Sequence, residues 1–277
     1  METHVSPLST GTGKAMEEAR PSIAKFQLSI KDAGNSYQGW VKKQSCVQKD
    51  IDIAGNLETI KRIWVPVWLF EVSAESAWHG QVSYTVNYTD YESVPISPHA
   101  YKQVAVSKER TEWRPASGNH YDNYFVPVSA SGEVTQEEIR GLKFGHLDLK
   151  SYDESYLEGL PVQTTDLSKM GAKDTCNRLI NDIERKVCKT EVESFGGCST
   201  KVTYNTSTFA LLPVFVLSYS HKDKSYRNLI NGVSGEVVGD VPINKIKKFV
   251  FTVVKVIAGI ILGLIVVFFF IALMGSH

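Results

Sequence analysis

The sequence predicts an α+β protein, with an antiparallel, β-rich cytosolic body, one longer helix and a single C-terminal transmembrane helix. Three patterns lead to this fold class. Residues 63–88 and 200–240 carry apolar side chains in strand-like alternation. Residues 176–187 repeat apolar side chains at the spacing of one helix face. Residues 256–274 are a run of nineteen uncharged, almost entirely apolar residues.

Three regions follow one another along the chain. Residues 1–21 are rich in Ser, Thr, Gly and charge, which predicts a disordered lead. Residues 22–244 are the predicted body, and residues 245–277 combine a basic collar with the apolar run. Three stretches of the body, WVPVWLF, YFVPVSA and LLPVFVL, share an apolar-Pro-Val core. They indicate either two similar sub-units, about 22–133 and 134–244, or three edge strands in which proline is tolerated.

The strands are predicted from side-chain alternation. Residues 63–72 are apolar on both faces, as in a buried strand, although Pro66 lacks the N–H that a ladder requires. Residues 78–86 alternate, which is typical of a strand with one face in water. The prolines within residues 88–115 predict loops and one polar strand there. Residues 200–240 predict three or four antiparallel strands, with a polar hairpin turn that starts at His221.

Helices are predicted from their caps and periodicity. A short helix is expected over residues 31–44, and Thr135 with Glu138 has the spacing of a capping box. Asp166 can cap a longer helix that ends near Lys189. Its predicted apolar stripe consists of Cys176, Ile180, Ile183 and Val187, and its predicted solvated side chains are Asn177, Asp182, Glu184 and Lys186.

The apolar run predicts a membrane anchor. A helix rises about 1.5 Å per residue, so about 20 apolar residues cross the hydrocarbon of a bilayer. Gly259 and Gly263 have the small-xxx-small spacing that lets two helices contact each other. The positive-inside rule predicts a single-pass protein with a cytoplasmic N-terminal body and a C-terminus on the far side. The lysines behind this orientation are Lys245, Lys247, Lys248 and Lys255.

The composition argues against several partners and cofactors. The chain has 30 basic and 30 acidic residues, which argues against nucleic acid as the main partner. No cofactor is predicted, because the sequence contains no G-x-x-x-x-G-K-[ST], no G-x-S-x-G and no H-E-x-x-H. No zinc site is predicted either, because no C-x-x-C occurs among Cys46, Cys176, Cys188 and Cys198.

An ordered set of motifs resembles one protein family. VPVWLFEV, YFVPVSAS, SYLEGLPV, TFALLPVFVLSY and YRNLINGVSGEVVGDVPINKIKK follow one another within residues 26–275. They resemble bacterial membrane proteins labelled TFIIB-type zinc-ribbon or replication-restart-helicase-like. The resemblance implies a partner of the SPFH (flotillin-like) or phage-shock type. The family's zinc ribbon is missing here, since no cysteine precedes Cys46, and the helicase label lacks a phosphate-binding loop to support it.

Two sets of side chains are candidates for function. Cys198 follows Phe-Gly-Gly and has some character of a nucleophile, for which His221 or His146 could supply the base. Large aromatic residues are favoured at protein interfaces, although apolar residues on strands are more often internal. The candidate partner contacts of this kind are Trp64, Trp68 and Phe70.

These patterns predict a non-catalytic, membrane-anchored scaffold or adaptor at the cytoplasmic face of a membrane, in membrane maintenance or in a larger complex. Its expected partners are the lipid bilayer and either a membrane protein or a second copy of the chain. Two alternatives stay open. One is a module that binds a lipid or another apolar ligand in an apolar pocket. The other is a cysteine hydrolase that uses Cys198.

Overall fold

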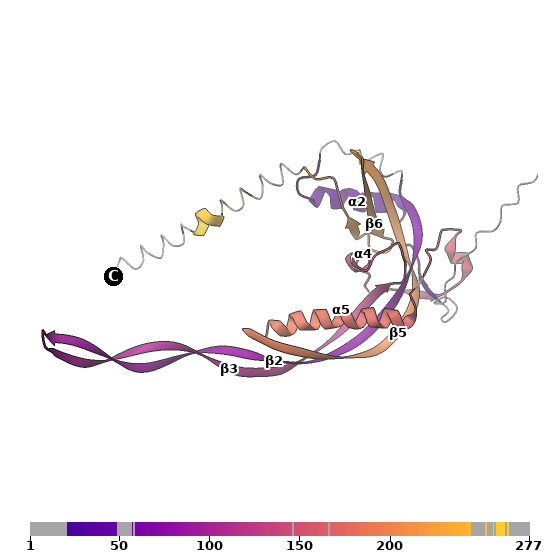
Figure 1. Cartoon of the computed structure of the whole chain (residues 1–277). Helices are drawn as coiled ribbons and strands as arrows, with labels where there is room; N and C mark the ends of the chain where they lie inside the picture. Colours follow the sequence, from indigo (N-terminus) through magenta and orange to yellow (C-terminus); the bar gives the residue numbers. More distant parts are fainter. Residues whose placement is uncertain are drawn as a thin grey trace, which may run out of the picture. The chain divides into compact units, whose positions relative to one another are not determined.

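The computed structural model describes most of the body and a few positions beyond it. The described residues are 21–48, 57, 59–145, 147–165, 167–244, 253, 257, 259–263 and 265. Seven strands form one sheet with the order β3-β2-β5-β1-β4, and β6 pairs with β5 and β7 (Figure 1). The strands are β1 (Ser22–Ala24), β2 (Lys61–Ser97), β3 (Ala100–Ser129), β4 (Leu149–Ser151), β5 (Ser194–His221), β6 (Lys224–Asn231) and β7 (Val237–Gly239).

The helices of the body begin at side-chain caps. They are α2 (Ile30–Lys43), α4 (Gln136–Gly141), the 3-10 helix η1 (Glu154–Leu157) and α5 (Lys169–Lys189). The predicted capping box of Thr135 and Glu138 is confirmed at the start of α4. Helix α5 is capped by Ser168, whose hydroxyl accepts a hydrogen bond from the N–H of Gly171. The predicted cap of α5, Asp166, lies outside the described residues.

The chain divides into two compact units, each made of discontinuous segments. Unit 1 comprises Met1–Val67, Ser129–Asp166 and Ala210–His277, and unit 2 comprises Trp68–Val128 and Leu167–Phe209. Strands β2 and β5 therefore each contribute one part to unit 1 and another part to unit 2. This division differs from the consecutive halves that the shared apolar-Pro-Val stretches suggest.

Unit 1 is built around a helix on a curved hairpin. Helix α2 lies beside β6 (Figure 1), and its buried side chains Ala33, Tyr37 and Val41 pack against residues of β5, β6 and β7. The β5–β6 turn places Lys222 and Asp223 at φ 49° and 60°, as a two-residue hairpin turn requires. The predicted turn after His221 is therefore confirmed.

Aromatic contacts join the two apolar clusters of unit 1. The ring of Phe26 lies edge-on to Trp64 and to Phe215, with centroids 5.0 Å apart in each pair. Trp64 packs with Ile23 and Leu211, whereas Phe215 packs below α2. Phe26 thus links the two clusters into one core.

Unit 2 consists of a helix on a sheet and a long hairpin. Figure 1 shows α5 lying along the sheet of β2, β3 and β5, and the β2–β3 hairpin continuing past the helix as a two-stranded ribbon. Residues 88–115 are therefore one continuous hairpin, and the prediction of loops with a single polar strand is wrong. Proline has no backbone N–H to donate, but no ladder bond is lost where that side of the strand faces water. Pro95 is therefore accommodated in β2.

The predicted C-terminal transmembrane helix is not supported. Among the described residues, no helix is both long enough and apolar enough to cross a membrane. This corrects the predicted fold class, the tail-anchored character and the single-pass location with a cytoplasmic body. Most of residues 256–274 lies outside the described residues.

We expect Phe215→Ala to lower the free energy of unfolding by about 4 kcal/mol, because removing a fully buried aromatic ring leaves a cavity. Urea unfolding followed by circular dichroism measures the change. The control is Ile30→Ala, which removes an exposed side chain of α2 and should change stability by less than about 0.5 kcal/mol. Equal effects of the two substitutions would contradict the described core of unit 1.

Candidate functional site

A buried carboxylate lies between α5 and the sheet of unit 2. The side chain of Glu184 is fully buried. Its Oε2 lies 3.0 Å from Nδ1 of His120, and its Oε1 accepts a hydrogen bond from the hydroxyl of Tyr124. Ser76 also bonds this carboxylate, and the Ser76 hydroxyl lies 2.8 Å from that of Thr200. Because Ser76 donates its single proton to Glu184, the hydroxyl of Thr200 donates to Ser76.

The local sequence explains how these side chains meet. Side chains of a strand alternate between faces, so Ser76 on β2 and His120 and Tyr124 on β3 all point toward α5. The buried positions of α5 recur every four residues. They are Ala172, Cys176, Ile180, Glu184 and Cys188.

The prediction that Glu184 is solvated is therefore wrong. Ile183 and Val187, which were expected on the apolar stripe, are only half-buried. Carboxylates are mostly exposed to solvent, so Glu184 was predicted on the solvated face of the helix. For this reason the four-residue repeat of small and apolar residues that includes its position was not recognised. The repeat from Ala172 to Cys188 is the signal in the sequence that could have revealed the site.

The hydrogen bonds set the charge of Glu184. Burial alone would raise the pKa of this carboxyl, but the hydrogen bonds from Ser76, Tyr124 and His120 outweigh burial and lower the pKa below its ordinary value. Glu184 is then ionised at neutral pH. Nδ1 of His120 consequently carries a proton, because an ionised carboxylate only accepts hydrogen bonds.

Two cysteines contact each other near the end of α5, where Cys188 lies one turn beyond Glu184 and Cys198 belongs to β5. The Sγ atoms of Cys188 and Cys198 are 3.2 Å apart, and Sγ of Cys198 is 3.7 Å from the hydroxyl of Thr200. Cys188 is buried and Cys198 is half-buried. Burial, together with the neighbouring Cys198 and the charge of Glu184, raises the pKa of Cys188 to about 12.

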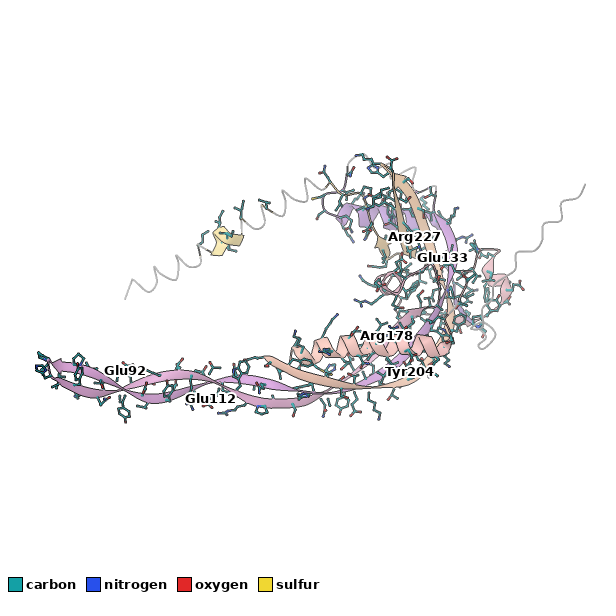
Figure 2. The ribbon with its side chains drawn as sticks, in the orientation of Figure 1. Glu92, Glu112, Glu133, Arg178, Tyr204 and Arg227 are labelled. Atoms are coloured by element: carbon teal, nitrogen blue, oxygen red, sulfur yellow. The ribbon has the colours of Figure 1, made fainter. Side chains whose placement is uncertain are left out.

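The ribbon carries a ladder of charged and aromatic pairs on one face. The ammonium of Lys108 lies 2.7 Å from Asp90 and 2.8 Å from Glu92. Arg110 lies over the ring of Tyr88, and Arg114 lies over the ring of Tyr84. Arg110 also pairs with Glu112, and Figure 2 shows Glu92 and Glu112 along the ribbon. The pairs that join β3 to β2 stabilise two strands that lack a hydrophobic layer over this face.

The far end of the ribbon exposes large apolar side chains. Ile96 and Tyr101 are 66% and 68% exposed, on either side of the turn. With their exposed neighbours, which strand alternation distributes over both faces of the ribbon's end, they make up what we call the tip patch. The tip patch consists of Tyr91, Val94, Ile96, Tyr101 and Val104. The sequence did not predict this patch, because the prolines of residues 88–115 indicate loops and not the end of a hairpin.

The structure places the predicted partner contacts in the core and the predicted catalytic thiol beside a second cysteine. Trp64, Trp68 and Phe70 are buried within the chain, as their core alternative requires. Sγ of Cys198 contacts Cys188 and Thr200 in unit 2, whereas His221 lies 3.1 Å from Gln48 in unit 1. His146 lies outside the described residues.

The remaining predicted positions belong to the C-terminal segment. Gly259 and Gly263 are helical, and a Cβ added to either would meet nothing within 4 Å in the described part of the chain. The predicted membrane-flanking lysines lie outside the described residues. They are Lys245, Lys247, Lys248 and Lys255.

Unit 1 has a polar hollow at the end of the β5–β6 hairpin. Its volume is about 580 Å³. It is lined by Gln48, His221, Lys222, Lys224, Tyr226, Asp240, Val241, Ile243 and Asn244. Ligand pockets for apolar molecules are lined mainly by apolar and aromatic side chains. This hollow therefore gives no support to the lipid-binding alternative.

Comparisons with known proteins give a distant relative. The chain is 22% identical over 234 residues to "Uncharacterized protein YdjG" of Bacillus subtilis (strain 168). The match covers 82% of this chain and 65% of the relative, so the chain spans less than two thirds of the relative's length. No family model matches the chain, and no solved structure matches it. The resemblance to the zinc-ribbon family accordingly stays a prediction.

We expect the stability of the protein to fall in acid through Glu184. The pKa of this carboxyl is lower in the folded chain than its ordinary value of 4.5. Its stabilising contribution is therefore complete above pH 4.5 and is lost as the pH falls through the lower, folded-state pKa. Glu184→Gln should lower the free energy of unfolding at neutral pH by about 2 kcal/mol. The NH2 group of glutamine is a hydrogen-bond donor, and it would face a group that now donates to the Glu184 carboxylate.

Urea unfolding at a series of pH values measures both effects. In Glu184→Gln, the free energy of unfolding should fall less steeply as the pH is lowered, because the titration of Glu184 no longer contributes. The control is Glu191→Gln, which changes an exposed carboxylate just after α5 and should leave the pH dependence as in the wild type. An unchanged pH profile in Glu184→Gln would show that the buried network does not hold an ionised carboxylate.

We also expect Lys108→Met to loosen the ribbon, because it removes the cation between Asp90 and Glu92. Amide hydrogen exchange within residues 84–114 should become faster. The difference from the wild type should shrink at about 1 M salt, where exposed charges are screened. Lys102→Met, on the same strand, is the control, and the idea fails if both variants accelerate exchange equally.

Proposed function

We propose that the protein is a non-catalytic adaptor that binds a protein partner through the tip patch of the β2–β3 ribbon. The observation that carries this proposal is the exposure of Ile96 and Tyr101, with their apolar neighbours, at the end of a ribbon. Single exposed apolar residues are common on protein surfaces. Five of them at the end of one hairpin, including two tyrosines and distributed over both faces, instead favour a partner that encloses the end of the ribbon.

The construction of the ribbon supports a binding role. A two-stranded hairpin without a covering layer is marginally stable in water. Here the ion pairs of Lys108 and the stacked arginines Arg110 and Arg114 stabilise the ribbon before it meets a partner. A surface that is already ordered loses less conformational entropy on binding, which favours affinity.

The chemistry of the tip also indicates how the partner is bound. Strand β3 is an edge strand of the sheet and offers unpaired backbone groups. Near the tip, Pro95 and Pro98 lack N–H groups and Lys102 adds a charge, which are features that discourage strand addition. We therefore favour a partner that receives the apolar side chains in a groove, in preference to one that adds a strand.

The two alternative functions receive less support. The polar lining of the hollow in unit 1 does not favour an apolar ligand. The contacts of Cys198 are with a second thiol and a hydroxyl, so no observation favours the hydrolase. The partner of SPFH or phage-shock type is implied by the family resemblance, and it enters here as one candidate for the protein that the tip patch binds.

The test compares cross-linking of the tagged full-length chain in cells between the wild type and Ile96→Ala/Tyr101→Ala. We expect one partner to be captured by the wild type and lost from the double variant. The same partner, once purified, should bind the double variant at least about tenfold more weakly, since interface hot spots cost about 2 kcal/mol or more.

Met170→Ala is the matched control, because Met170 is 70% exposed on α5 and lies outside the tip patch. This variant should capture and bind the partner as the wild type does. Equal binding by the double variant would overturn the proposal. Capture of a second copy of the chain alone would replace the adaptor by a self-associating protein.

A further inference from the structure

The contact between Cys188 and Cys198 joins two elements of unit 2. Cys188 occupies the last turn of α5, and Cys198 lies near the start of β5. Their Sγ atoms are 3.2 Å apart. A disulfide bond is about 2.05 Å long, so the two sulfurs need to approach by only about 1 Å to be joined. The other cysteines are separate from this pair, since Cys176 lies three turns earlier in α5 and Cys46 belongs to unit 1.

We propose that Cys188 and Cys198 are a redox-active pair that closes to a reversible intramolecular disulfide by exchange with a low-molecular-weight disulfide. The inference goes beyond the adaptor function and does not depend on it. It is carried by the contact of the two sulfurs, by their different exposure and by their position beside a buried ionised group.

The two sulfurs have different roles in the exchange. Cys198 is half-buried and is therefore the sulfur that an external disulfide can reach. Its thiolate attacks one sulfur of the low-molecular-weight disulfide, the bond between the two external sulfurs breaks, and one external thiolate leaves with the electron pair. The product is a mixed disulfide on Cys198.

Cys188 completes the reaction. Its thiol gives its proton to the released thiolate, and its sulfur attacks the sulfur of Cys198 and expels the second external thiolate. This second thiolate takes up from water the proton that Cys198 released when it ionised. The net change is oxidation of two protein thiols and reduction of one external disulfide to two thiols. Burial, the sulfur of Cys198 and the charge of Glu184 raise the pKa of Cys188, which lowers the fraction of its attacking thiolate and slows this second step.

The disulfide would fasten the end of α5 to β5 at a defined place. Glu184 lies one turn before Cys188, and Thr200 contacts both Cys198 and the Ser76 hydroxyl that bonds Glu184. Oxidation therefore acts on the same side of the sheet as the buried carboxylate. A dithiol reductant reverses the change by the same exchange in the opposite direction.

The experiment treats the full-length, folded protein with oxidised glutathione and then blocks the remaining thiols with an alkylating agent. We expect a mass lower by two hydrogen atoms before alkylation. We also expect a non-reducing peptide map that links the peptides of Cys188 and Cys198, while Cys176 is not part of the link. After treatment with a dithiol, four thiols should be alkylated once the chain is unfolded in denaturant.

Three variants separate the roles of the cysteines. Cys188→Ser should stop at the glutathione adduct on Cys198, and Cys198→Ser should form neither adduct nor disulfide at Cys188. Cys176→Ser is the matched control in the same helix and should close the disulfide as the wild type does. If a serine variant fails to fold, the peptide map of the wild-type chain still decides the question.

Several results would overturn the inference. One is a wild-type chain in which Cys188 and Cys198 both stay reduced while oxidised glutathione is in excess. Another is a disulfide that links either of them to Cys46 or Cys176. A third is closure that occurs only in the presence of denaturant, because the link would then belong to the unfolded chain.

Discussion

Adjacent side chains of a strand point to opposite faces, and the rest of unit 2 depends on this geometric constraint. Under α5, the side chains of Trp68, Phe70 and Ser76 are buried, whereas the intervening Glu71 and Glu75 are exposed. From Glu71 onward, the helix covers one face and leaves the other mostly to water. Beyond the helix the same two strands continue with mostly exposed side chains, so the apolar layer is replaced by ion pairs and stacked arginines. One pair of strands thus uses two different sources of stability along its length.

Glu184 shows how a charge can be part of an apolar layer. Its carboxylate receives hydrogen bonds from β2 and from two positions of β3, so no part of its charge is left without a donor. Hydrogen bonds are directional, and apolar contacts are not. The three donors therefore specify how far α5 is rotated and shifted over the sheet, which packing of Ile180 and Cys176 alone would define less sharply.

Local signals in the sequence predict part of this structure. Caps depend on neighbouring residues, and the capping box at Thr135 is found where its spacing places it. The burial of Glu184 depends on donors from strands that are more than 50 residues away in the sequence, and a single segment carries no trace of them. The ribbon was missed because its prolines resemble loop signals, although exposed edges tolerate proline. The membrane helix was inferred from apolarity alone.

The ribbon also constrains how the protein can change during evolution. Because side chains alternate between faces, a single inserted residue within β2 would move Tyr84, Tyr88 and Asp90 to the face opposite their partners on β3. A change of length is compatible with the ladder when both strands gain or lose residues in pairs near the turn. Homologous ribbons should therefore differ in reach by whole repeats of the pleat.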